Sequence, residues 1–276
     1  LAWDVLVLNL YFLLNLVIVG YLLYCTYLGR RPNKRFIVPL ILVSIPAAIS
    51  IHTVTAFIYN GMAARPFWNA SILAPRFLAS AMCSGPAILL ILFQLLRRTT
   101  RFEIKDEALW KIAEIMAYAM FINLFLLGAE IFKELYSSTQ HLLHFNYLFF
   151  GIGKHTALAP YGWSSVICST LAFLLFVIPA TRRNPVTLNL GCLLIYVGVY
   201  IEKGMGLVIP GLTPDTLGEI YEYAPSLAEV RIGVACFSVG FFVYTVLTKI
   251  AVEITLGDFT RDGSAAAGGN KARADG

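Results

Sequence analysis

Charged residues are scarce in this chain of 276 residues. They make up 13% of it and hydrophobic residues make up 58%, whereas a soluble domain is usually about 25% charged and about 45–50% apolar. The mean hydropathy is +0.74. This shortage of charge excludes an ordinary soluble domain and predicts an all-α, polytopic membrane protein. The net charge of +5 does not indicate nucleic-acid binding, because the basic residues cluster at the ends of apolar segments.

Clustered metal ligands are also lacking. An iron–sulfur cluster or a zinc site needs several thiolates close together. The cysteines instead stand singly in apolar segments, without CxxC spacing: Cys25, Cys83, Cys168, Cys192 and Cys236. His52 is the one histidine within an apolar span, so a bis-histidine haem has no second ligand at matching depth. We expect buried core cysteines and no intrinsic haem or cluster.

The N-terminus shows neither a cleavable signal peptide nor an initiator Met. Leu1 already belongs to an apolar run. Either the N-terminus is processed or the sequence begins part-way through a longer protein, and we favour the second interpretation.

Long apolar runs, by contrast, are abundant. Seven segments approach the roughly 20 residues that a helix needs to cross the hydrocarbon core of a membrane. They cover about 4–27, 36–60, 72–96, 109–132, 158–181, 186–209 and 232–255. The sequence therefore predicts a bundle of about seven transmembrane helices.

The connections between these segments alternate in charge. The basic residues fall in the first, third and fifth connections and in the tail: Arg30, Arg31, Lys34, Arg35, Arg97, Arg98, Arg101, Lys105, Arg182, Arg183, Arg261, Lys271 and Arg273. Basic loops stay in the cytoplasm. This pattern predicts that Leu1 lies outside the cytoplasmic membrane and that the C-terminus lies in the cytoplasm.

Three segments outside the predicted spans differ in composition. Within 133–157, the aromatic run HLLHFNYLFFG favours a helix lying in the membrane interface. Within 213–231, acids and tyrosines offer a docking surface on the outer side. The small, glycine-rich segment 257–276 favours a disordered cytoplasmic tail, which leaves 1–256 as the transmembrane domain.

Glu202 and Lys203 stand side by side in the apolar run VGVYIEKGMGLVIPG. A charge at the bilayer centre costs about 2.5–3.5 kcal/mol. Adjacent helical residues point in different directions, so the two are not expected to pair with each other. Each needs a partner on another helix or a wet cavity. Two interpretations are open: a structural bridge between helices, or groups that line a polar cavity and transfer protons.

Other charged residues of the spans are candidates for the same chemistry. Glu130 and Lys133 are three residues apart and are expected to form an ion pair on one helix face. Glu130 is also a candidate for proton transfer near the outer face. Glu114 lies in the inner half and could continue a proton path toward the cytoplasm.

His52 lies in SIPAAISIHTVTAF, about two-thirds of the way through its span toward the outside. An imidazole accepts and releases a proton near neutral pH. Asp4 and Arg76 are also expected near the outer face. Beside them, His52 could bind and deprotonate a quinol hydroxyl, and the other interpretation is a packing histidine with structural hydrogen bonds.

Three runs carry a resemblance to a known family. They are AWDVLVLNLYFLLNLVIVGYLLY, SIPAAISIHTVTAFIYNGMAARPFWNASILAPRFLASAMCSGPAILL and YIEKGMGLVIPGLTPDTLGEIYEYAPSLAEV. They resemble the NrfD/PsrC family, the polysulfide-reductase type of membrane subunit. Within it they are most similar to the DsrP-type subunit of a sulfite-reductase-linked transmembrane electron-transfer complex. The resemblance covers nearly all of 1–256.

The resemblance implies a subunit without redox cofactors that binds menaquinol or another quinone near the outer face. It implies electron exchange with a ferredoxin-like iron–sulfur subunit docked there, in a complex with further membrane and cytochrome subunits that serves sulfur-compound metabolism. By position, Asp4, His52 and Arg76 match polar positions of the family's outer pocket. The family core has eight helices and the DsrP-like branch about ten, so helices before Leu1 are expected.

Two rival functions stay open. A proton-coupled secondary transporter would fit broken helices and intramembrane charge, although no internal repeat is visible and the charge lies off-centre. An inert membrane anchor for soluble redox subunits would need none of His52, Asp4 or Glu202. In the quinol interpretation the chain is not catalytic alone.

Overall fold

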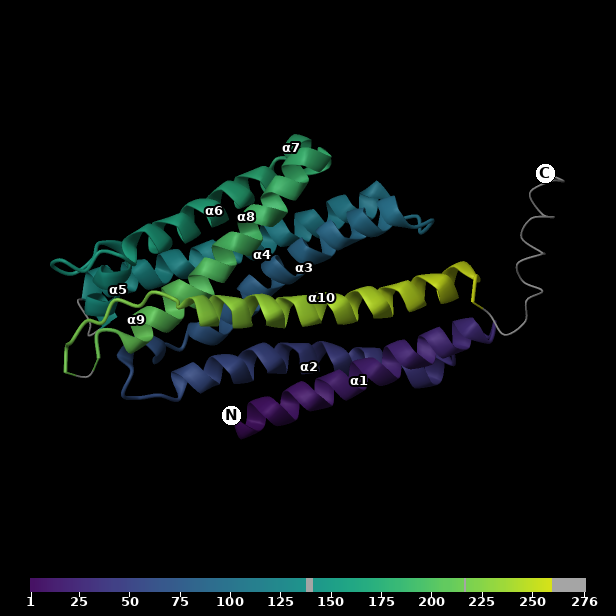
Figure 1. Ribbon diagram of the computed structural model, residues 1–276, viewed down its shortest axis with the longest axis horizontal. Coiled ribbons are helices and arrows are strands. Elements are labelled where there is room, and N and C mark those ends of the chain that lie inside the picture. The colour runs from purple at the N-terminus through teal and green to yellow at the C-terminus, as the bar shows by residue number, and fades with distance from the viewer. Residues whose placement is uncertain (138–140, 216, 260–276) are drawn as a thin grey trace. The chain divides into compact units, whose positions relative to one another are not determined.

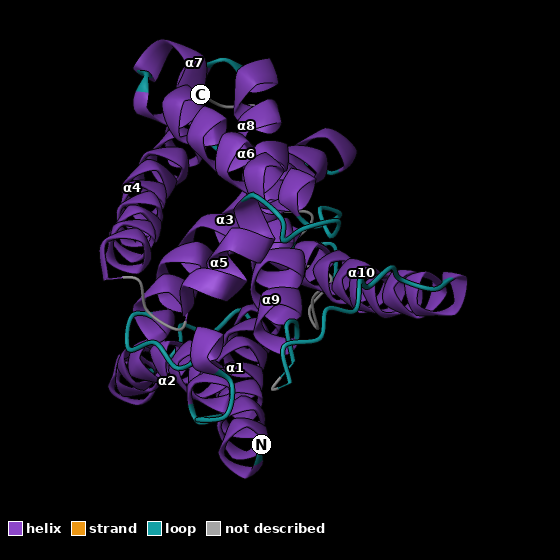
Figure 2. Ribbon diagram, turned by 90° about the vertical axis from the view of Figure 1, so that its left-hand side faces the viewer, coloured by secondary structure: helices purple, strands orange, loops and turns teal. Residues whose placement is uncertain are grey.

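The structure is a computed structural model that describes residues 1–137, 141–215 and 217–259. Within these ranges every regular element is a helix, and the one extended feature is an isolated bridge between Ile152 and His155. Figure 2 shows helices joined by loops. The all-α prediction is confirmed.

Seven helices of the described residues are long and apolar enough to cross a membrane. They are α1 (Ala2–Tyr27), α2 (Lys34–Asn60), α3 (Leu73–Thr99), α4 (Asp106–Ser137), α6 (Ala159–Val177), α8 (Pro185–Lys203) and α10 (Leu227–Leu256), as labelled in Figure 1. After Lys203, α8 continues through the π-helical turn η2 (Gly204–Val208) into α9 (Ile209–Leu212). The seven predicted spans are confirmed.

The ends of these helices follow local chemistry. α6 stops at Val177 because Ile178, the residue before Pro179, adopts an extended conformation. Asn184 caps α8 by accepting a hydrogen bond from the Val186 amide, with Pro185 at the first helical position. α10 begins with a capping box between Ser226 and Glu229.

Short helices lie between the long ones: η1 (Pro66–Trp68), α5 (His141–Phe149) and α7 (Pro179–Arg183). α5 supplies the helix expected within 133–157, and its aromatic side chains Phe145, Tyr147 and Phe149 are buried in a protein core cluster. The aromatic run thus packs against protein, while its place in a membrane interface stays a prediction. In the described part of the acidic segment, the chain is irregular until α10 begins.

The chain divides into two compact units. Unit 1 comprises 1–51, 99–102 and 224–276, of which residues to 259 are described. In unit 1, α1 packs along α10, and Tyr21 contacts Phe36 edge-on with ring centroids 5.1 Å apart. From residue 260 onward, the predicted disordered tail lies outside the described residues, and the assignment of 1–256 to one domain stays a prediction.

Unit 2 comprises 52–98 and 103–223 and contains α3, α4, α6 and α8. These four helices run in alternating directions. We name the two ends of unit 2 after their short helices: the α5 end, which also holds η1 and α9, and the α7 end (Figure 1). α3 and α6 begin at the α5 end, whereas α4 and α8 begin at the α7 end.

Two glycines let α6 and α8 pack closely in unit 2. A Cβ on Gly191 would lie 2.7 Å from Cζ of Phe176, and a Cβ on Gly198 would lie 2.9 Å from Oγ of Ser169. Any larger residue would push the helices apart. The core beside them is apolar and includes the fully buried Ile195.

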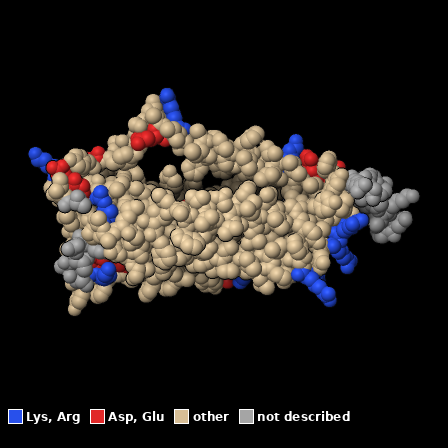
Figure 3. All heavy atoms as spheres, turned by 90° about the horizontal axis from the view of Figure 1, so that it is seen from below, with Lys and Arg blue, Asp and Glu red and all other residues tan. Residues whose placement is uncertain are grey.

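Charged side chains gather mainly toward the ends of the helices. On the face shown in Figure 3, most of the surface is uncharged, and Lys, Arg, Asp and Glu lie in a few separate groups. Large hydrophobic side chains are exposed along every long helix. A protein dissolved in water rarely exposes so much apolar surface. The chain is therefore a multi-pass membrane protein.

Candidate functional site

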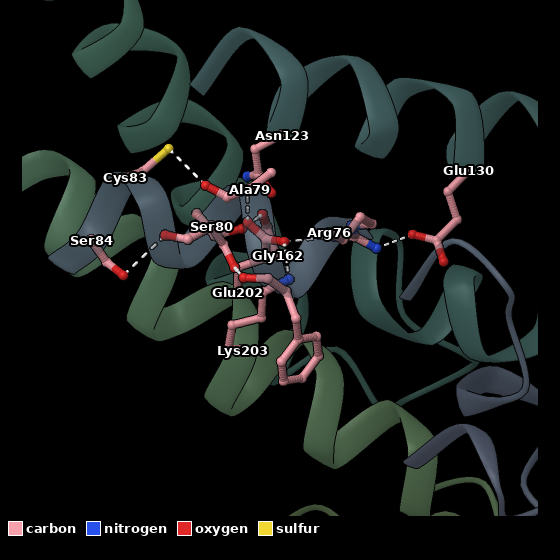
Figure 4. A network of polar contacts seen from close by, with 12 residues as sticks. Arg76, Ala79, Ser80, Cys83, Ser84, Asn123, Glu130, Gly162, Glu202 and Lys203 are labelled. Carbon is pink, nitrogen blue, oxygen red and sulfur yellow. Dashed lines mark hydrogen bonds and ion pairs between the residues drawn. The ribbon is translucent and has the colours of Figure 1, made fainter. Parts of the chain in front are cut away.

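A cluster of charged side chains lies between α3, α4 and α8 in unit 2 (Figure 4). Arg76 of α3 is at its centre. Its guanidinium donates through Nη1 to Glu130 of α4 and through Nη2 to Glu202 of α8, the latter at 2.7 Å. The side chains of Arg76 and Glu202 are each 9% exposed. Charges this deeply buried are tolerated because they are paired and hydrogen-bonded.

Glu202 collects further donors from its own helix and from α4. Lys203 Nζ lies 3.0 Å from Glu202 Oε1, and Asn123 Nδ2 donates to Glu202 Oε2 at 3.2 Å. Both carboxylate oxygens are therefore hydrogen-bonded. We call the set of Arg76, Asn123, Glu130, Glu202 and Lys203 the ion cluster. With two cations and two carboxylates its formal charges cancel.

The prediction that Glu202 and Lys203 do not pair with each other is wrong. The lysine side chain has a flexible four-carbon stem, which lets the ammonium group reach back to the preceding residue. The same group lies 5.0 Å from the centroid of the Phe77 ring, a cation–π contact. The expectation of partners on neighbouring helices is confirmed for Glu202 through Arg76 and Asn123.

The predicted Glu130–Lys133 pair is also wrong. Glu130 bonds Arg76, while Lys133 Nζ lies 3.3 Å from Glu134 Oε1. Arg76 comes from another helix, so no spacing within α4 could reveal it. Glu130 is thereby drawn into the ion cluster, and Lys133 stays at the exposed end of α4.

The helix changes its winding directly after Lys203. The π-helical turn η2 follows there, and such turns frequently occur at functional sites. Trp68 of η1 holds this turn, because its Nε1 donates to the Leu207 carbonyl at 2.8 Å. Its ring also packs so closely on Gly211 that no Cβ would fit there. Trp68 therefore anchors the turn that directly follows Lys203.

A groove of about 400 Å³ opens beside the ion cluster. Small-molecule sites usually measure about 300–1,000 Å³. We call it the His52 groove, and its main side chains come from α2, α3 and α8: His52, Phe77, Ser80, Ser84, Tyr196, Tyr200 and Lys203. Aromatic rings next to an imidazole, hydroxyls and an ammonium group suit a flat ring that carries oxygen atoms.

A second, small cavity of about 40 Å³ lies on the other side of the ion cluster, toward the α5 end. We call it the carboxylate cavity because Glu130, Glu134 and Glu202 line it together with Arg76 and Lys203. Aromatic and aliphatic side chains of α5 close it. Lys203 lines both this cavity and the His52 groove.

The structure brings five of the predicted site residues together in unit 2. His52 lines the groove, Arg76, Glu130 and Glu202 line the carboxylate cavity, and Lys203 lines both. His52 and Arg76, predicted to act side by side, thus line two different cavities. The assignment of these residues to quinone binding and proton transfer stays a prediction.

The two other predicted residues lie elsewhere. Asp4 is in the first turn of α1, in unit 1. Glu114 lies on α4 toward the α7 end, where it accepts from Lys111 Nζ at 3.3 Å and from Tyr118 at 3.2 Å, and lies 3.6 Å from Arg182. Glu114 is therefore held in a separate polar group.

Sequence reasoning missed Asn123 and Glu134, although their spacing gives a signal. Asn123 is a polar residue inside an apolar helix, seven residues before Glu130, and Glu134 follows Glu130 by four. Residues four and seven apart lie on one helix face. The polar face of α4 was thus readable, whereas the tyrosines of the groove, Tyr196 and Tyr200, look like ordinary membrane aromatics.

Metal-binding geometry does not occur in the described part of the chain: no three His, Cys, Asp or Glu side chains are grouped to hold an ion. The donors that the site does offer are an imidazole, an ammonium group, a guanidinium and hydroxyls. These groups can hydrogen-bond a ligand oxygen and can take up or release a proton.

Comparison with known proteins identifies relatives over most of the chain. The family profile described as "Polysulphide reductase, NrfD" matches residues 1–213. A putative dimethyl sulfoxide reductase membrane subunit of Halobacterium salinarum is 25% identical over 235 residues, which cover 77% of this chain and 52% of that protein. A selenate reductase subunit of Mesobacillus selenatarsenatis is 22% identical over 232 residues, 80% of this chain and 53% of that protein. The chain spans about half the length of these curated relatives.

Proposed function

The chain belongs to the NrfD family of polysulphide reductase proteins, and we propose that it is the integral membrane subunit of a reductase-type redox complex. In this proposal it binds menaquinol or another quinone in the His52 groove. It exchanges electrons with a partner iron–sulfur subunit and has no haem or cluster of its own. The two relatives are named as subunits of a dimethyl sulfoxide reductase and of a selenate reductase, which supports a place in a reductase complex.

One observation carries the proposal: the His52 groove meets a buried ion cluster at Lys203. An inert anchor has no use for two buried and two half-buried charges, which are costly in a membrane unless a function retains them. The groove has aromatic walls for a flat ring and polar groups for its oxygens. A quinone, with an apolar ring and two oxygens, fits this chemistry.

Oxidation of a quinol to a quinone releases two electrons and two protons. In the proposed reaction, the His52 imidazole accepts a hydroxyl proton, and the Lys203 ammonium stabilises the negative charge that develops on the oxygen. Phe77, Tyr196 and Tyr200 hold the ring. The electrons pass to the iron–sulfur centre of the partner subunit, and the reverse direction uses the same groups.

The ion cluster handles the protons in this proposal. Lys203 connects the groove to Glu202, and Arg76 connects Glu202 to Glu130. The guanidinium keeps its own protons, so Arg76 holds the two carboxylates in place while the proton moves between them through water. Glu114 stays a predicted member at the α7 end.

The proposed orientation places the α5 end outside and the α7 end in the cytoplasm, following the basic connections. Acidic residues gather in the loop at the α5 end. Asp215 orders it by accepting hydrogen bonds from the Leu217 and Glu219 amides, both at 2.9 Å, and Glu222 lies 3.6 Å from His155. We propose this loop as part of the docking surface for the iron–sulfur subunit, with Asp4 as an outer-face residue.

The proposed physiological role is electron transfer linked to sulfur compounds such as sulfite, with electrons flowing in either direction. The family resemblance motivates this link. Growth on sulfite or sulfate compared with growth on other electron acceptors, in a strain that lacks the gene, tests it.

Quinone content tests the proposed site directly. The complex is purified as wild type, as His52→Ala and as His155→Ala, and the extracted lipids are analysed for quinone. His155 offers the same chemical change outside the groove. We expect the wild type and His155→Ala to contain bound quinone. In His52→Ala we expect most of the bound quinone to be lost, and quinol oxidation to be lost with it.

Other outcomes point to the rival functions. Equal quinone in all three proteins would remove His52 from the site. A wild-type complex that binds no quinone would favour the inert anchor. Solute-driven proton movement by the reconstituted chain would favour a transporter.

A further inference from the structure

Unit 2 is polar on one side of the ion cluster and apolar on the other. On the α7 side, each of the four helices contributes buried apolar residues at successive turns: Cys83, Ala87 and Leu90 of α3, Ala113, Met116 and Met120 of α4, Ala172 and Phe176 of α6, and Cys192 and Ile195 of α8. Each of these side chains is 0% exposed. We call this set the apolar layer.

Apart from the buried hydroxyl of Ser169 on α6, which lies beside Gly198, the next polar contact between helices toward the α7 end lies beyond this layer. Gln94 of α3 and Asn189 of α8 form a reciprocal amide pair, with hydrogen bonds of 2.7 and 3.1 Å. On α8, a rise of about 1.5 Å per residue separates Asn189 from Glu202 by roughly 20 Å. Along α3 the apolar layer itself extends from Cys83 to Leu90, about 10 Å, and a close-packed apolar region does not hold a chain of water molecules.

The α5 side of the cluster offers a buried carboxylate that the proposed function does not yet use. Glu134 is 2% exposed as a residue, yet it lines the carboxylate cavity with Glu130 and Glu202. It follows Glu130 by one helical turn, about 6 Å along the axis. Its neighbours Lys133 and Leu135 are exposed. Glu134 therefore lies between the cavity and the exposed end of α4.

Buried polar atoms in and beside this cavity call for water. Within the described residues, Arg76 Nε and Asn123 Oδ1 are buried without a hydrogen-bond partner from the protein. Arg76, only 7% exposed, lines the carboxylate cavity. Buried polar atoms without protein partners are usually satisfied by internal water. Water there would connect the carboxylates that are too far apart to bond directly.

From this asymmetry we infer that protons enter and leave the His52 groove at the α5 end, through the carboxylate of Glu134, and that the apolar layer closes unit 2 toward the α7 end. Glu134 receives a proton from water in the carboxylate cavity and returns one to water at the end of α4, or the reverse. No net charge is gained or lost by the relay. The inference rests on the proposed function, and it differs from the predicted path through Glu114.

Reconstituted complex tests the direction. The wild-type complex is placed in liposomes of phosphatidylethanolamine and phosphatidylglycerol with the α7 end in the lumen. Reduced benzyl viologen supplies two electrons to the soluble subunits, and menadione accepts them together with two protons. The rate of menadione reduction in protein-free liposomes is subtracted. A pH dye in each compartment reports proton uptake. We expect two protons per menadione from the outside medium and no change in the lumen.

Variants of α4 test the residue. Glu134→Gln is expected to lower the turnover number at least about tenfold, since positioned proton-transfer groups contribute about 10²–10⁴, with the KM for menadione and the bound quinone unchanged. Glu134→Asp is expected to restore part of the rate. Glu107→Gln, an exposed change on the same helix, is the matched control and is expected to behave as wild type.

Several results would overturn the inference while leaving the proposed function intact. The first is proton uptake from the lumen, and the second is a loss of that uptake when Glu114 is replaced. The third is a turnover number of Glu134→Gln within twofold of the wild-type value. If Glu134→Gln does not fold, Glu134→Asp and the wild-type lumen measurement decide. A wild-type complex that neither binds quinone nor reduces menadione would overturn the proposed function, and the inference with it.

Discussion

Unit 1 and unit 2 are built from helices of similar length and hydropathy, but they bury their side chains to very different extents. In unit 1, the share of the apolar stretch that is buried is 0% for α10 and 6% for α1. In unit 2, it reaches 44% for the span Pro185–Leu212. Apolar composition qualifies a helix for the membrane in both units. It does not say whether the helix faces lipid or protein.

Polar side chains separate the two units more clearly. In unit 1, Asn9 donates to the Val5 carbonyl at 2.7 Å and Asn15 to the Tyr11 carbonyl at 2.8 Å, each within its own helix. In unit 2, Arg76, Asn123 and Gln94 bond to residues of other helices. Polar groups that satisfy themselves locally specify no partner, whereas those of unit 2 hold helices in one arrangement and mark the candidate site.

The largest expected difference between the units is the cost of losing a polar partner. Glu202→Gln leaves Arg76 and Lys203 with Glu130 as the remaining carboxylate of the cluster. Breaking a buried ion pair costs about 3–5 kcal/mol. Equilibrium unfolding of the purified protein in mixed detergent micelles measures the loss, and Asn9→Leu in unit 1 is expected to stay within about 0.5 kcal/mol of wild type. Equal losses for both changes would erase the distinction between the units.

Replacing a glycine with alanine is expected to lower the free energy of unfolding in unit 2 and to raise it in unit 1. Gly191→Ala places a methyl group against the Phe176 ring, and overpacking costs about 1–3 kcal/mol. In Gly20→Ala, the added methyl group on α1 meets nothing within 4 Å. We expect the free energy of unfolding to rise by up to about 1 kcal/mol, because alanine is the better helix former. The same unfolding assay applies. A stabilised Gly191→Ala protein would show that α6 and α8 do not pack as described.

The smallest effect is expected at the amide pair of unit 2. Gln94→Leu leaves the buried amide of Asn189 without its partner, and such interhelical bonds contribute about 0.6–2 kcal/mol. Replacing both residues with leucine is expected to recover part of the loss, because no orphaned amide remains. Ser238→Ala in α10, where the hydroxyl bonds its own helix at 2.8 Å, is the control. Additive losses in the double variant would show that the pair is not coupled.

The spans were predictable from the sequence because crossing a membrane imposes a length and a composition on each helix. The break at Ile178, before Pro179, was also readable in principle, since proline disfavours helical geometry in the residue before it. The division into two units was not. It depends on which apolar faces meet, and apolar residues that face lipid and those that face protein look alike in one sequence.

The candidate site was predictable in membership more than in geometry. His52, Arg76, Glu130, Glu202 and Lys203 stood out because charge and imidazole are rare in apolar runs. Their pairing was predicted wrongly where the partner came from another helix, as with Arg76 and Glu130, or where a flexible stem bent back, as with Lys203. Contacts between helices are set by packing, which residue spacing within one helix does not encode.

The most direct test of the central claim is a cryo-electron microscopy map of the whole complex, prepared with a hydroxyquinoline N-oxide as a quinol analogue. The account predicts density for the aromatic ring in the His52 groove, between Phe77 and the tyrosines of α8, with its oxygens toward His52 and Lys203. A ring bound elsewhere, with the groove filled by lipid or by protein side chains, would contradict it.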